Sequence, residues 1–468
     1  MNTQPSLQTN RKPISLSYQD KPLVDFWELS ADNRLEILLN AIIQSHTDHY
    51  TRNAAYRLAM NARNIGPQIS TREIGRLPRT TSILFKSYID ALGSPFPQDN
   101  PTGFIAWLQD QISITFPKER FSLFRKSYPS IEALLSDFER IFADLGFEIL
   151  TSSGTSGRVS IMLRNQRGIQ RTVESFYLAF QRYLGMQADH RAIFIMPQQT
   201  RIAMVRMASF SVKRIGLPSD HIHFTIPFPA SPDHVRIRSG RTYRMDWRGW
   251  AERKLWNPLM NWANDALVTP YAIQKTIDLL KQAEARQEKV LVFGSWMHLH
   301  GIALFLKSTS QKLSLAPGSL FGTGGGFKEI YPYTIDEIQL DISREIQYPD
   351  GQPVILRDVY GMAEGNWAAM QCKEGNYHIP PWILAYTLDE NDNIQEKMDS
   401  KGLLAFFDPY GGGDLFPAFF KTADQVHLMN DIISGAETCP CGDSGAYIAR
   451  SSIQRVDLLD EAGCAAQI

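Results

Sequence analysis

The residues best suited to chemistry form a glycine- and hydroxyl-rich stretch at residues 150–160, with the sequence LTSSGTSGRVS. Apolar residues precede and follow it, so a strand, a tight loop and a second strand are expected. Glycines let main-chain N–H groups approach a ligand closely, and neighbouring hydroxyls add hydrogen-bond donors. The stretch therefore predicts a loop that holds phosphate oxygens, and its candidate residues are Ser152, Ser153, Gly154, Thr155, Ser156 and Gly157.

This loop is not a Walker A loop, because no Lys-Ser/Thr pair follows the second glycine. On its own it would equally fit a solvated turn. Its sequence resembles the phosphate loop of the adenylate-forming enzymes, which include acyl-CoA ligases, synthetase adenylation domains and luciferase. The resemblance implies that Thr155 and Ser156 act on the phosphates of ATP. Many of these enzymes end the loop with Pro-Lys, where this chain has Arg158.

A second glycine cluster follows at residues 321–328, with the sequence FGTGGGFK. Three consecutive glycines let the backbone approach a flat ligand or a carboxylate. The cluster resembles the second glycine loop of the adenylate-forming enzymes, which lines the adenine and the acyl carboxylate. Its form is most similar to that of acyl-protein synthetases. The resemblance implies a nucleotide-binding role for Gly324, Gly325 and Gly326.

Residues 359–365, VYGMAEG, resemble the YGMTE motif of the same superfamily. An aromatic ring can stack on adenine, a glycine allows its approach, and a carboxylate can hold Mg²⁺ against the α-phosphate. The resemblance implies that Tyr360, Gly361 and Met362 contact the nucleotide and that Glu364 binds Mg²⁺. The alternative is a strand end with a tyrosine and a solvated glutamate.

The last five residues of the stretch FPAFFKTAD resemble the "Y-R-T-G-D" strand and turn of the superfamily. Asp424 is expected to close an apolar strand and to accept hydrogen bonds from both ribose hydroxyls. Phe420, Lys421 and Ala423 stand where Tyr, Arg and Gly are commoner, which leaves the geometry of the turn open. Asp414 is the alternative ribose ligand.

Three cysteines and a histidine form a candidate metal site: Cys372, His378, Cys439 and Cys441. Cys372 and His378 bracket a polar turn, and the later pair forms a tight Cys-Pro-Cys-Gly knuckle. Three thiolates and one imidazole would close a tetrahedral zinc site with no open position, hence a structural one. The order of the ligands resembles zinc sites in the phenylacetate-CoA-ligase branch of the superfamily. The alternative is a set of buried free cysteines beside a surface histidine.

Residues 448–457, IARSSIQRVD, resemble the approach to the hinge of adenylate-forming enzymes, with Arg455 and Asp457 at the "GR…D" positions. The superfamily normally continues into a mobile C-terminal domain, which we expect to be missing here. Cys464 matches a cysteine that, in the acyl-protein synthetases of bacterial luminescence, accepts the acyl group from the adenylate and passes it to a partner protein. The alternative is an ordinary tail thiol.

The elements that position these residues follow from hydrophobic periodicity. Asp32 is the expected N-cap of the first long helix. Strands and helices alternate after the phosphate loop, which predicts an α/β fold with central sheets flanked by helices. The expected helices lie at about residues 25–62, 131–145, 170–184 and 271–286, and further strands at about 192–196 and 289–293.

We expect three parts: a mainly helical region at residues 1–140, an α/β adenylation core at residues 141–436, and a zinc knuckle with a truncated tail at residues 437–468. The resemblance covers residues 147–468. Residues 1–140 show no resemblance to a known family.

Composition excludes several classes of protein. The chain has 468 residues, of which 43% are hydrophobic and 21% charged, as in globular proteins. A net charge of −1 provides no basic surface for nucleic acid, and no apolar run approaches the length of a membrane span. The polar N-terminus and only four cysteines predict a cytoplasmic protein. Residues 239–262 are rich in Arg and Trp; such a run binds nucleic acid or, as we expect here, packs arginines on aromatic rings.

Together the motifs predict an enzyme that activates a carboxylic acid with ATP and Mg²⁺ as an acyl-adenylate, releases pyrophosphate, and transfers the acyl group to a thiol of a protein or carrier. His298 or His300 would orient the carboxylate or line the acyl pocket, unless both are core residues. Two alternatives remain. One is an acyl-CoA or amide ligase of the same superfamily, and the other is a non-catalytic scaffold that binds an acyl group or a carrier protein.

Overall fold

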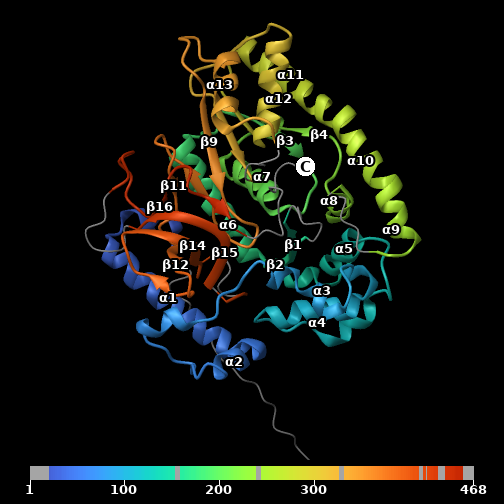
Figure 1. Ribbon diagram of the computed structural model, residues 1–468, viewed down its shortest axis with the longest axis vertical. Helices are drawn as coiled ribbons and strands as arrows, with labels where there is room; N and C mark the ends of the chain where they lie inside the picture. Colours follow the sequence, from blue (N-terminus) through green and yellow to red (C-terminus); the bar gives the residue numbers. More distant parts are fainter. Residues whose placement is uncertain are drawn as a thin grey trace, which may run out of the picture.

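The computed structural model describes residues 21–152, 159–238, 244–325, 331–410, 415–417, 419–430 and 438–456. Within these residues, one large sheet runs through the molecule in the strand order β13-β12-β14-β15-β16-β11-β10-β9-β7-β5-β3-β4, with β17 paired to β15. Helices flank this sheet (Figure 1), which confirms the predicted α/β class.

Five neighbouring strands of the sheet are parallel. Alternate residues of β3 reach two different cores: Ala192 and Phe194 pack with helices α6 and α7, whereas Ile193 and Ile195 pack with α11, α12 and α13. A strand buried on both faces must be apolar throughout, which explains the continuous run in the sequence. The bounds are β3 Arg191–Pro197, β4 Ile222–Ile226, β5 Val290–Gly294, β7 Leu320–Gly324, β9 Ile355–Tyr360, α6 Gln166–Ala179, α7 Ala203–Ile215, α11 Thr269–Arg286, α12 Trp296–Ser308 and α13 Ile335–Glu345.

The other half of the sheet is antiparallel. Its two longest strands, β14 and β15, pair along most of their length. The strands are β10 Ala369–Gln371, β11 Tyr377–His378, β12 Leu384–Leu388, β13 Ile394–Gln395, β14 Asp399–Phe407, β15 Phe419–Met429, β16 Tyr447–Ile448 and β17 Gln454–Arg455.

The N-terminal helices pack against this antiparallel half and share its core. Thr80 exchanges backbone hydrogen bonds with β15, from its N–H to the carbonyl of Phe419 (2.7 Å) and from the N–H of Lys421 to its carbonyl (2.8 Å). The division of the chain at residue 140 stays a prediction. These helices are α1 Ala31–Arg52, α2 Ala54–Asn61, α3 Tyr88–Leu92, α4 Pro101–Gln111 and α5 Ile131–Ile141.

The remaining elements lie outside the large sheet. Strands β1 (Phe147–Thr151) and β2 (Ile161–Asn165) form a separate antiparallel hairpin around the first glycine-rich loop, as the sequence predicts. Short strands β6 (Leu313–Ser314) and β8 (Ile346–Gln347) pair with each other. Among the helices of the described residues, none combines the length and the apolar character that crossing a bilayer requires.

Two details of the sequence-based prediction were wrong. The N-cap of α1 is Ser30, whose hydroxyl accepts a hydrogen bond from the N–H of Asn33 (3.3 Å), so Asp32 lies inside the first turn. The expected helix at residues 25–62 is interrupted at Asn53, whose extended backbone ends α1 and whose side chain caps α2. An N-cap residue needs an extended backbone, so the residue that caps the second helix cannot also continue the first.

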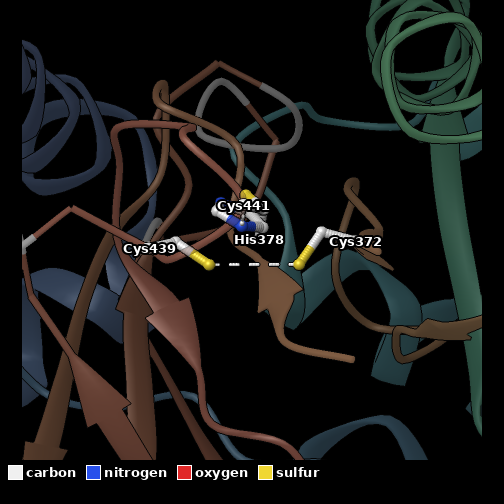
Figure 2. Close-up of side chains that lie close together, drawn as sticks. All are labelled: Cys372, His378, Cys439 and Cys441. Carbon is white, nitrogen blue, oxygen red and sulfur yellow. Dashed lines mark hydrogen bonds between the residues drawn. The ribbon is translucent and has the colours of Figure 1, made fainter. Parts of the chain in front are cut away.

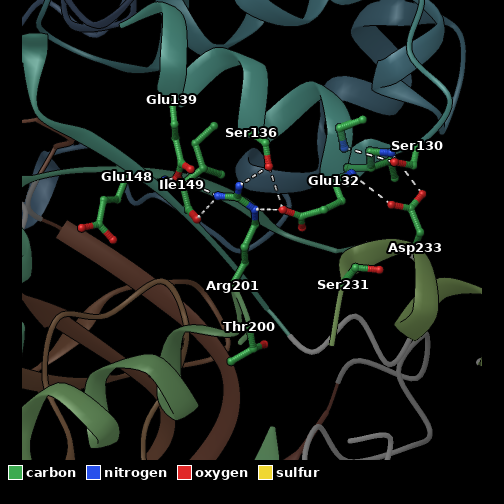
Figure 3. A network of polar contacts seen from close by, with 12 residues as sticks. Ser130, Glu132, Ser136, Glu139, Glu148, Ile149, Thr200, Arg201, Ser231 and Asp233 are labelled. Atoms are coloured by element: carbon green, nitrogen blue, oxygen red, sulfur yellow. Dashed lines mark hydrogen bonds and ion pairs between the residues drawn. The ribbon is translucent and has the colours of Figure 1, made fainter. Parts of the chain in front are cut away.

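A buried arginine joins helix α5 to strand β1 (Figure 3). The guanidinium of Arg201 donates to Glu132 (2.8 Å), Glu139 (2.6 Å) and Ser136 (3.0 Å) on α5, and to the carbonyl of Ile149 on β1 (3.3 Å). Its own carbonyl accepts from the N–H of Thr151 (2.8 Å), the last residue of β1. Arg201 thus fixes the end of the strand that leads into the first glycine-rich loop.

Arg201→Ala is expected to lower the free energy of unfolding by roughly 2–3 kcal/mol, because buried acceptors lose their donor while partial exposure of the carboxylates limits the loss. Urea unfolding followed by circular dichroism measures this change. The control is Arg206→Ala, which breaks a pair with Glu148 in which the two side chains are 28% and 32% exposed. That variant should lose less than about 1 kcal/mol. If both variants lost the same free energy of unfolding, Arg201 would contribute no more to stability than a partly exposed ion pair.

Candidate active site and metal centre

The predicted motifs gather at the carboxyl ends of the parallel strands, where ligands bind in open α/β sheets. Strand β7 ends at Gly324 and β9 ends at Tyr360. The two strands are neighbours, with Gly324 paired to Val359. The second glycine cluster and the VYGMAEG stretch therefore lie side by side, although about 35 residues separate them in the sequence.

Glycine is required where β7 leaves the sheet. A Cβ atom at Gly324 would lie 3.1 Å from the sulfur of Met204 and 3.3 Å from the carbonyl oxygen of Val359. Gly325 has a φ of 91°, in the left-handed region that glycine adopts without strain. These contacts leave little room for a side chain at this edge. Gly326 lies outside the described residues.

The first glycine-rich loop is closed at its base by two hydrogen bonds. The N–H of Ser152 donates to the carbonyl of Ser160 (3.1 Å), and the N–H of Ser160 donates to the hydroxyl of Ser152 (2.9 Å). The residues between these two ends that were predicted to hold phosphate lie outside the described part of the chain: Ser153, Gly154, Thr155, Ser156 and Gly157, together with Arg158.

A hydrogen bond connects this hairpin to the loop after β9. The hydroxyl of Ser160 donates to Oε1 of Glu364 (2.8 Å), and both residues are buried. The base of the predicted phosphate loop, at Ser160, therefore meets the predicted magnesium ligand across about 200 residues of sequence.

Arg164 holds the same loop by its backbone and was missed by the sequence analysis. This buried side chain donates to the carbonyls of Ala363 (3.2 Å) and Glu364 (3.0 Å), and its guanidinium lies 5.5 Å from the ring centroid of Phe416. The available signal was its place in β2, where it follows three buried apolar residues. A charged group at such a position needs specific partners.

On its other side, the loop is fixed by Asn366. The side-chain amide of Asn366 donates to the buried carboxylate of Asp408 (3.1 Å), and the hydroxyl of Thr172 on α6 donates to its amide oxygen (3.2 Å). Glu364 therefore lies between Ala363, whose carbonyl is bound by Arg164, and Asn366, whose side chain is bound by Asp408 and Thr172. A carboxylate placed in this way has little freedom, as a preorganised ligand or electrostatic group requires.

Tyr360 connects the loop to strand β15. Its hydroxyl donates to Oδ2 of Asp424 (2.7 Å), and the N–H of Asp424 donates to the hydroxyl of Thr422 (3.1 Å). Burial raises the pKa of Tyr360 well above its ordinary value and the adjacent carboxylate adds to the effect, so this hydroxyl remains a proton donor. Asp424 pairs in register with Arg455 of β17, which brings two predicted nucleotide-binding residues together.

The sequence suggested that Asp424 closes its strand, but the strand continues beyond this residue. Strand β15 continues to Met429, because its pairing with β14 resumes at Gln425 after a register shift that leaves residues 422–424 without a partner in β14. The expected turn at this position was therefore wrong, whereas the neighbours of Asp424 fit a binding residue. The alternative ligand, Asp414, lies outside the described residues, as do Asp457 and Cys464.

A narrow pocket opens beside the loop that carries Glu364. Its walls come from helices α6 and α7, from β2 and from the loop itself. Methionine and phenylalanine side chains make it largely apolar, and a few polar groups converge at one side, as is usual for small-molecule pockets. The main lining residues are Phe176, Met204, Met207, Met362, Arg164 and Asn366.

The two histidines of α12 differ in their surroundings. His298 lies in the first turn after β5, close to the carboxyl end of the sheet, with Nδ1 at 3.0 Å from the hydroxyl of Ser295. Burial lowers its pKa to about 4, so the ring is neutral at physiological pH. His300 instead lies between Tyr331 (2.9 Å) and Asp341 (3.2 Å) and connects α12 to α13. Both histidines are buried, and neither lines the pocket beside Glu364.

The four predicted metal ligands come together (Figure 2). The ligand atoms of Cys372, His378, Cys439 and Cys441 all lie within 4.8 Å of one another. The sulfurs of Cys372 and Cys439 are 3.9 Å apart, and Nε2 of His378 is 3.4 Å from the sulfur of Cys441. A tetrahedral ion with metal–ligand distances typical of zinc would need about 3.8 Å between two sulfurs and about 3.5 Å between sulfur and nitrogen.

Backbone and side-chain N–H groups surround these sulfurs. The amide of Asn376 donates to Cys439 (3.3 Å) and the N–H of Asp443 donates to Cys441 (3.4 Å). Burial raises the pKa of the Cys441 thiol to about 12 and lowers the pKa of His378. Without a cation, the thiols and the imidazole are therefore favoured in their neutral forms. A bound cation would instead favour the deprotonated thiolates. This donor set can hold a metal ion.

Part of the chain matches a known protein family. Residues 263–468 match the family described as "Acyl-protein synthetase, LuxE". None of the curated protein sequences matches the chain significantly. The matched family is one that the sequence motifs resemble.

Solved structures show the same fold. A 2-hydroxyisobutyryl-CoA ligase in an open conformation, in complex with 2-HIB-AMP and CoA, superposes with a TM-score of 0.55 and 12% identity, covering 96% of this chain and 80% of the ligase. The same ligase in its thioesterification state gives a TM-score of 0.55 and 13% identity, covering 93% and 70%. The chain therefore has the fold of the large N-terminal domain of adenylate-forming enzymes.

Proposed function

We propose that the protein is an adenylate-forming ligase that condenses a carboxylic acid with ATP and then passes the acyl group to a thiol. The observation that carries the proposal is the pair of hydrogen bonds that joins separate motifs, from Ser160 to Glu364 (2.8 Å) and from Tyr360 to Asp424 (2.7 Å). The motifs lie far apart in the sequence, and one site needs all of them.

In the first step, an oxygen of the substrate carboxylate attacks the α-phosphorus of ATP. A P–O bond forms, the bond to the β-phosphate breaks, and pyrophosphate leaves. The carboxylate oxygen becomes part of AMP, which is a far better leaving group than oxide. The acid would occupy the apolar pocket beside Met362, the ribose would lie against Asp424, and the phosphates would lie at residues 152–160.

Glu364 is the proposed Mg²⁺ ligand. A buried carboxylate beside a serine hydroxyl offers the oxygen ligands that this cation prefers. When bound, Mg²⁺ would neutralise charge that builds up on the α-phosphate. The protein contributes the position of the carboxylate, through the bonds from Arg164 to the carbonyls of Ala363 and Glu364.

Glu364→Gln should reduce acid-dependent ATP–pyrophosphate exchange at least ~100-fold, because a neutral amide is a poor ligand for the cation on the reacting phosphate. A panel of aliphatic and aromatic acids identifies the substrate with the wild type first. The matched control, Glu390→Gln, changes an exposed glutamate and should keep full exchange. Near-normal exchange in Glu364→Gln would contradict the proposed binding of Mg²⁺ by Glu364. If the wild-type protein showed no exchange with any acid, the result would favour a non-catalytic scaffold.

We propose Cys464 as the thiol that receives the acyl group in the second step. The thiolate attacks the carbonyl carbon of the acyl-adenylate, a thioester forms, and AMP leaves with the electron pair. The support is the similarity to acyl-protein synthetases, since this cysteine lies outside the described residues. Coenzyme A or a carrier protein is the alternative acceptor, and the solved ligase neighbours are named with CoA.

With ATP and the radiolabelled acid, the wild type should gain a hydroxylamine-labile label, and Cys464→Ala should not. Both proteins should retain pyrophosphate exchange, because exchange reports only the first step. Gel fluorography after hydroxylamine treatment measures the label. If Cys464→Ala transfers the acyl group to coenzyme A as fast as the wild type does, the acceptor is external.

We further propose that the cluster of Cys372, His378, Cys439 and Cys441 binds structural zinc. Four protein ligands leave no position for a substrate, and the distances between ligand atoms fit a tetrahedral ion. The site would fasten the turn after β10 to the knuckle before β16. The metal would thus stabilise the antiparallel half of the sheet without taking part in catalysis.

Metal analysis should find one zinc ion per chain, and Cys439→Ala should lose it. The melting temperature of this variant should fall by about 5–10 °C, because the free energy of metal binding contributes to folding. Cys464→Ala is the control for losing a cysteine and should keep both the zinc and the melting temperature. Protein purified without chelator that contains no zinc would disprove the site.

A further inference from the structure

A long helical segment stands along one edge of the molecule (Figure 1). Many of its apolar side chains are exposed. It comprises α9 (Trp247–Ala251), a π-helical turn (Glu252–Trp256), α10 (Asn257–Ala263), a second π-helical turn (Asn264–Val268) and α11. The junctions keep helical backbone angles, so the helix is continuous, and none of residues 250–271 is buried.

The segment is firmly held on its inner side. Arg236 forms two hydrogen bonds with Glu252 (2.7 and 2.8 Å), and Asn257 donates to the carbonyls of Ile237 (2.7 Å) and Arg238 (3.1 Å). These contacts attach it to helix α8 (Pro232–Arg238). The exposed side chains therefore belong to a fixed surface.

The sequence analysis expected the tryptophans of this region to pack under arginines, and this holds only in part. Arg248 lies over Trp247 at 5.7 Å, and Arg244 lies over Phe96 at 4.0 Å. The four tryptophans of the helix nevertheless remain more than half exposed, and Trp247 reaches 74%.

The exposed apolar area is large for a monomer. The four tryptophans alone, at roughly 200 Å² per aromatic side chain, leave on the order of 500 Å² exposed. Four aliphatic side chains and a tyrosine beside them are also at least half exposed: Met245, Leu255, Leu259, Leu267 and Tyr271. The total approaches the ~800 Å² that each partner contributes to a standard protein interface and exceeds the largest patch of a typical monomer.

Every fourth residue from Trp247 to Tyr271 is apolar, and Leu259 is the middle one. On a regular α-helix such a repeat would drift around the axis by about 40° per step. The two π-helical turns, which hold more residues per turn, take up this drift and keep the row on one face. The result is a straight apolar ridge of about seven positions.

This ridge is complementary to itself when reversed about Leu259. An antiparallel copy would place Leu255 against Ala263 and Leu267 against Ala251, so that a large side chain faces a small one in these pairs. Leu259 would meet its own copy on the axis, and the aromatic residues Trp247 and Tyr271 would meet at the two ends of the ridge. An isologous two-fold interface requires this kind of self-complementarity, in which residue i meets j and j meets i.

We propose that two copies of this chain associate through the 247–271 helix, antiparallel, about a two-fold axis at Leu259. The area of the patch and the pairing of large with small residues favour a second copy over other partners. A lipid surface would use the apolar area but gives no reason for the reversed symmetry of the ridge.

The test is the mass of the full-length protein in solution, measured by light scattering and sedimentation equilibrium. The wild type is expected to be a dimer, and Leu259→Arg, which brings two like charges together on the axis, should halve the mass without lowering the melting temperature. Leu58→Arg changes an equally large residue that is 69% exposed on α2 and should remain dimeric.

A swap of large and small residues tests the pairing itself. Leu255→Ala and Ala263→Leu should each weaken the dimer at least tenfold, and the double variant should recover it, because each pair again contains one leucine and one alanine. A monomeric wild type at tens of micromolar, or a dimer that survives Leu259→Arg, would overturn the proposal. It would also be overturned if the monomer instead sediments with phosphatidylserine-containing vesicles in a manner that requires Leu259.

Discussion

The buried hydrogen bond from Ser160 to Glu364 (2.8 Å) is the contact on which the candidate site depends. A carboxylate removed from water is costly unless its partners are placed correctly, so this contact constrains the hairpin of β1 and β2 against the loop after β9. Arg164 adds two hydrogen bonds to the same loop. Arg201 joins helix α5 to the end of β1 that leads into the glycine-rich loop. The N-terminal helices therefore help to position the site although they contribute no residue to it.

The sequence predicted the motifs and most of the secondary structure around them. Strands β3 and β5, helix α11 and the β1–β2 hairpin lie within a few residues of their expected places, because each is a short apolar or periodic run. The gathering of the motifs was predicted only through resemblance. Periodicity alone contains no information on which strands become neighbours.

Other features were missed because they depend on distant partners. The role of Arg164 is visible only when residue 364 lies beside it. Strand β15 passes Asp424 because its pairing with β14 resumes at Gln425 after a register shift, and no local signal in the chain marks that continuation. In α1, Ser30 and Asp32 are both suitable caps, and the choice between them depends on where the preceding residues pack.

The central claim is that separate motifs form one nucleotide site at the carboxyl ends of β7 and β9. A crystal structure with Mg²⁺ and an ATP analogue that resists cleavage between the α- and β-phosphates tests this most directly. The account predicts the α-phosphate beside Glu364, the ribose hydroxyls on Asp424 and the adenine beside Tyr360. A nucleotide bound elsewhere on the protein, with Glu364 still paired only to Ser160, would contradict it.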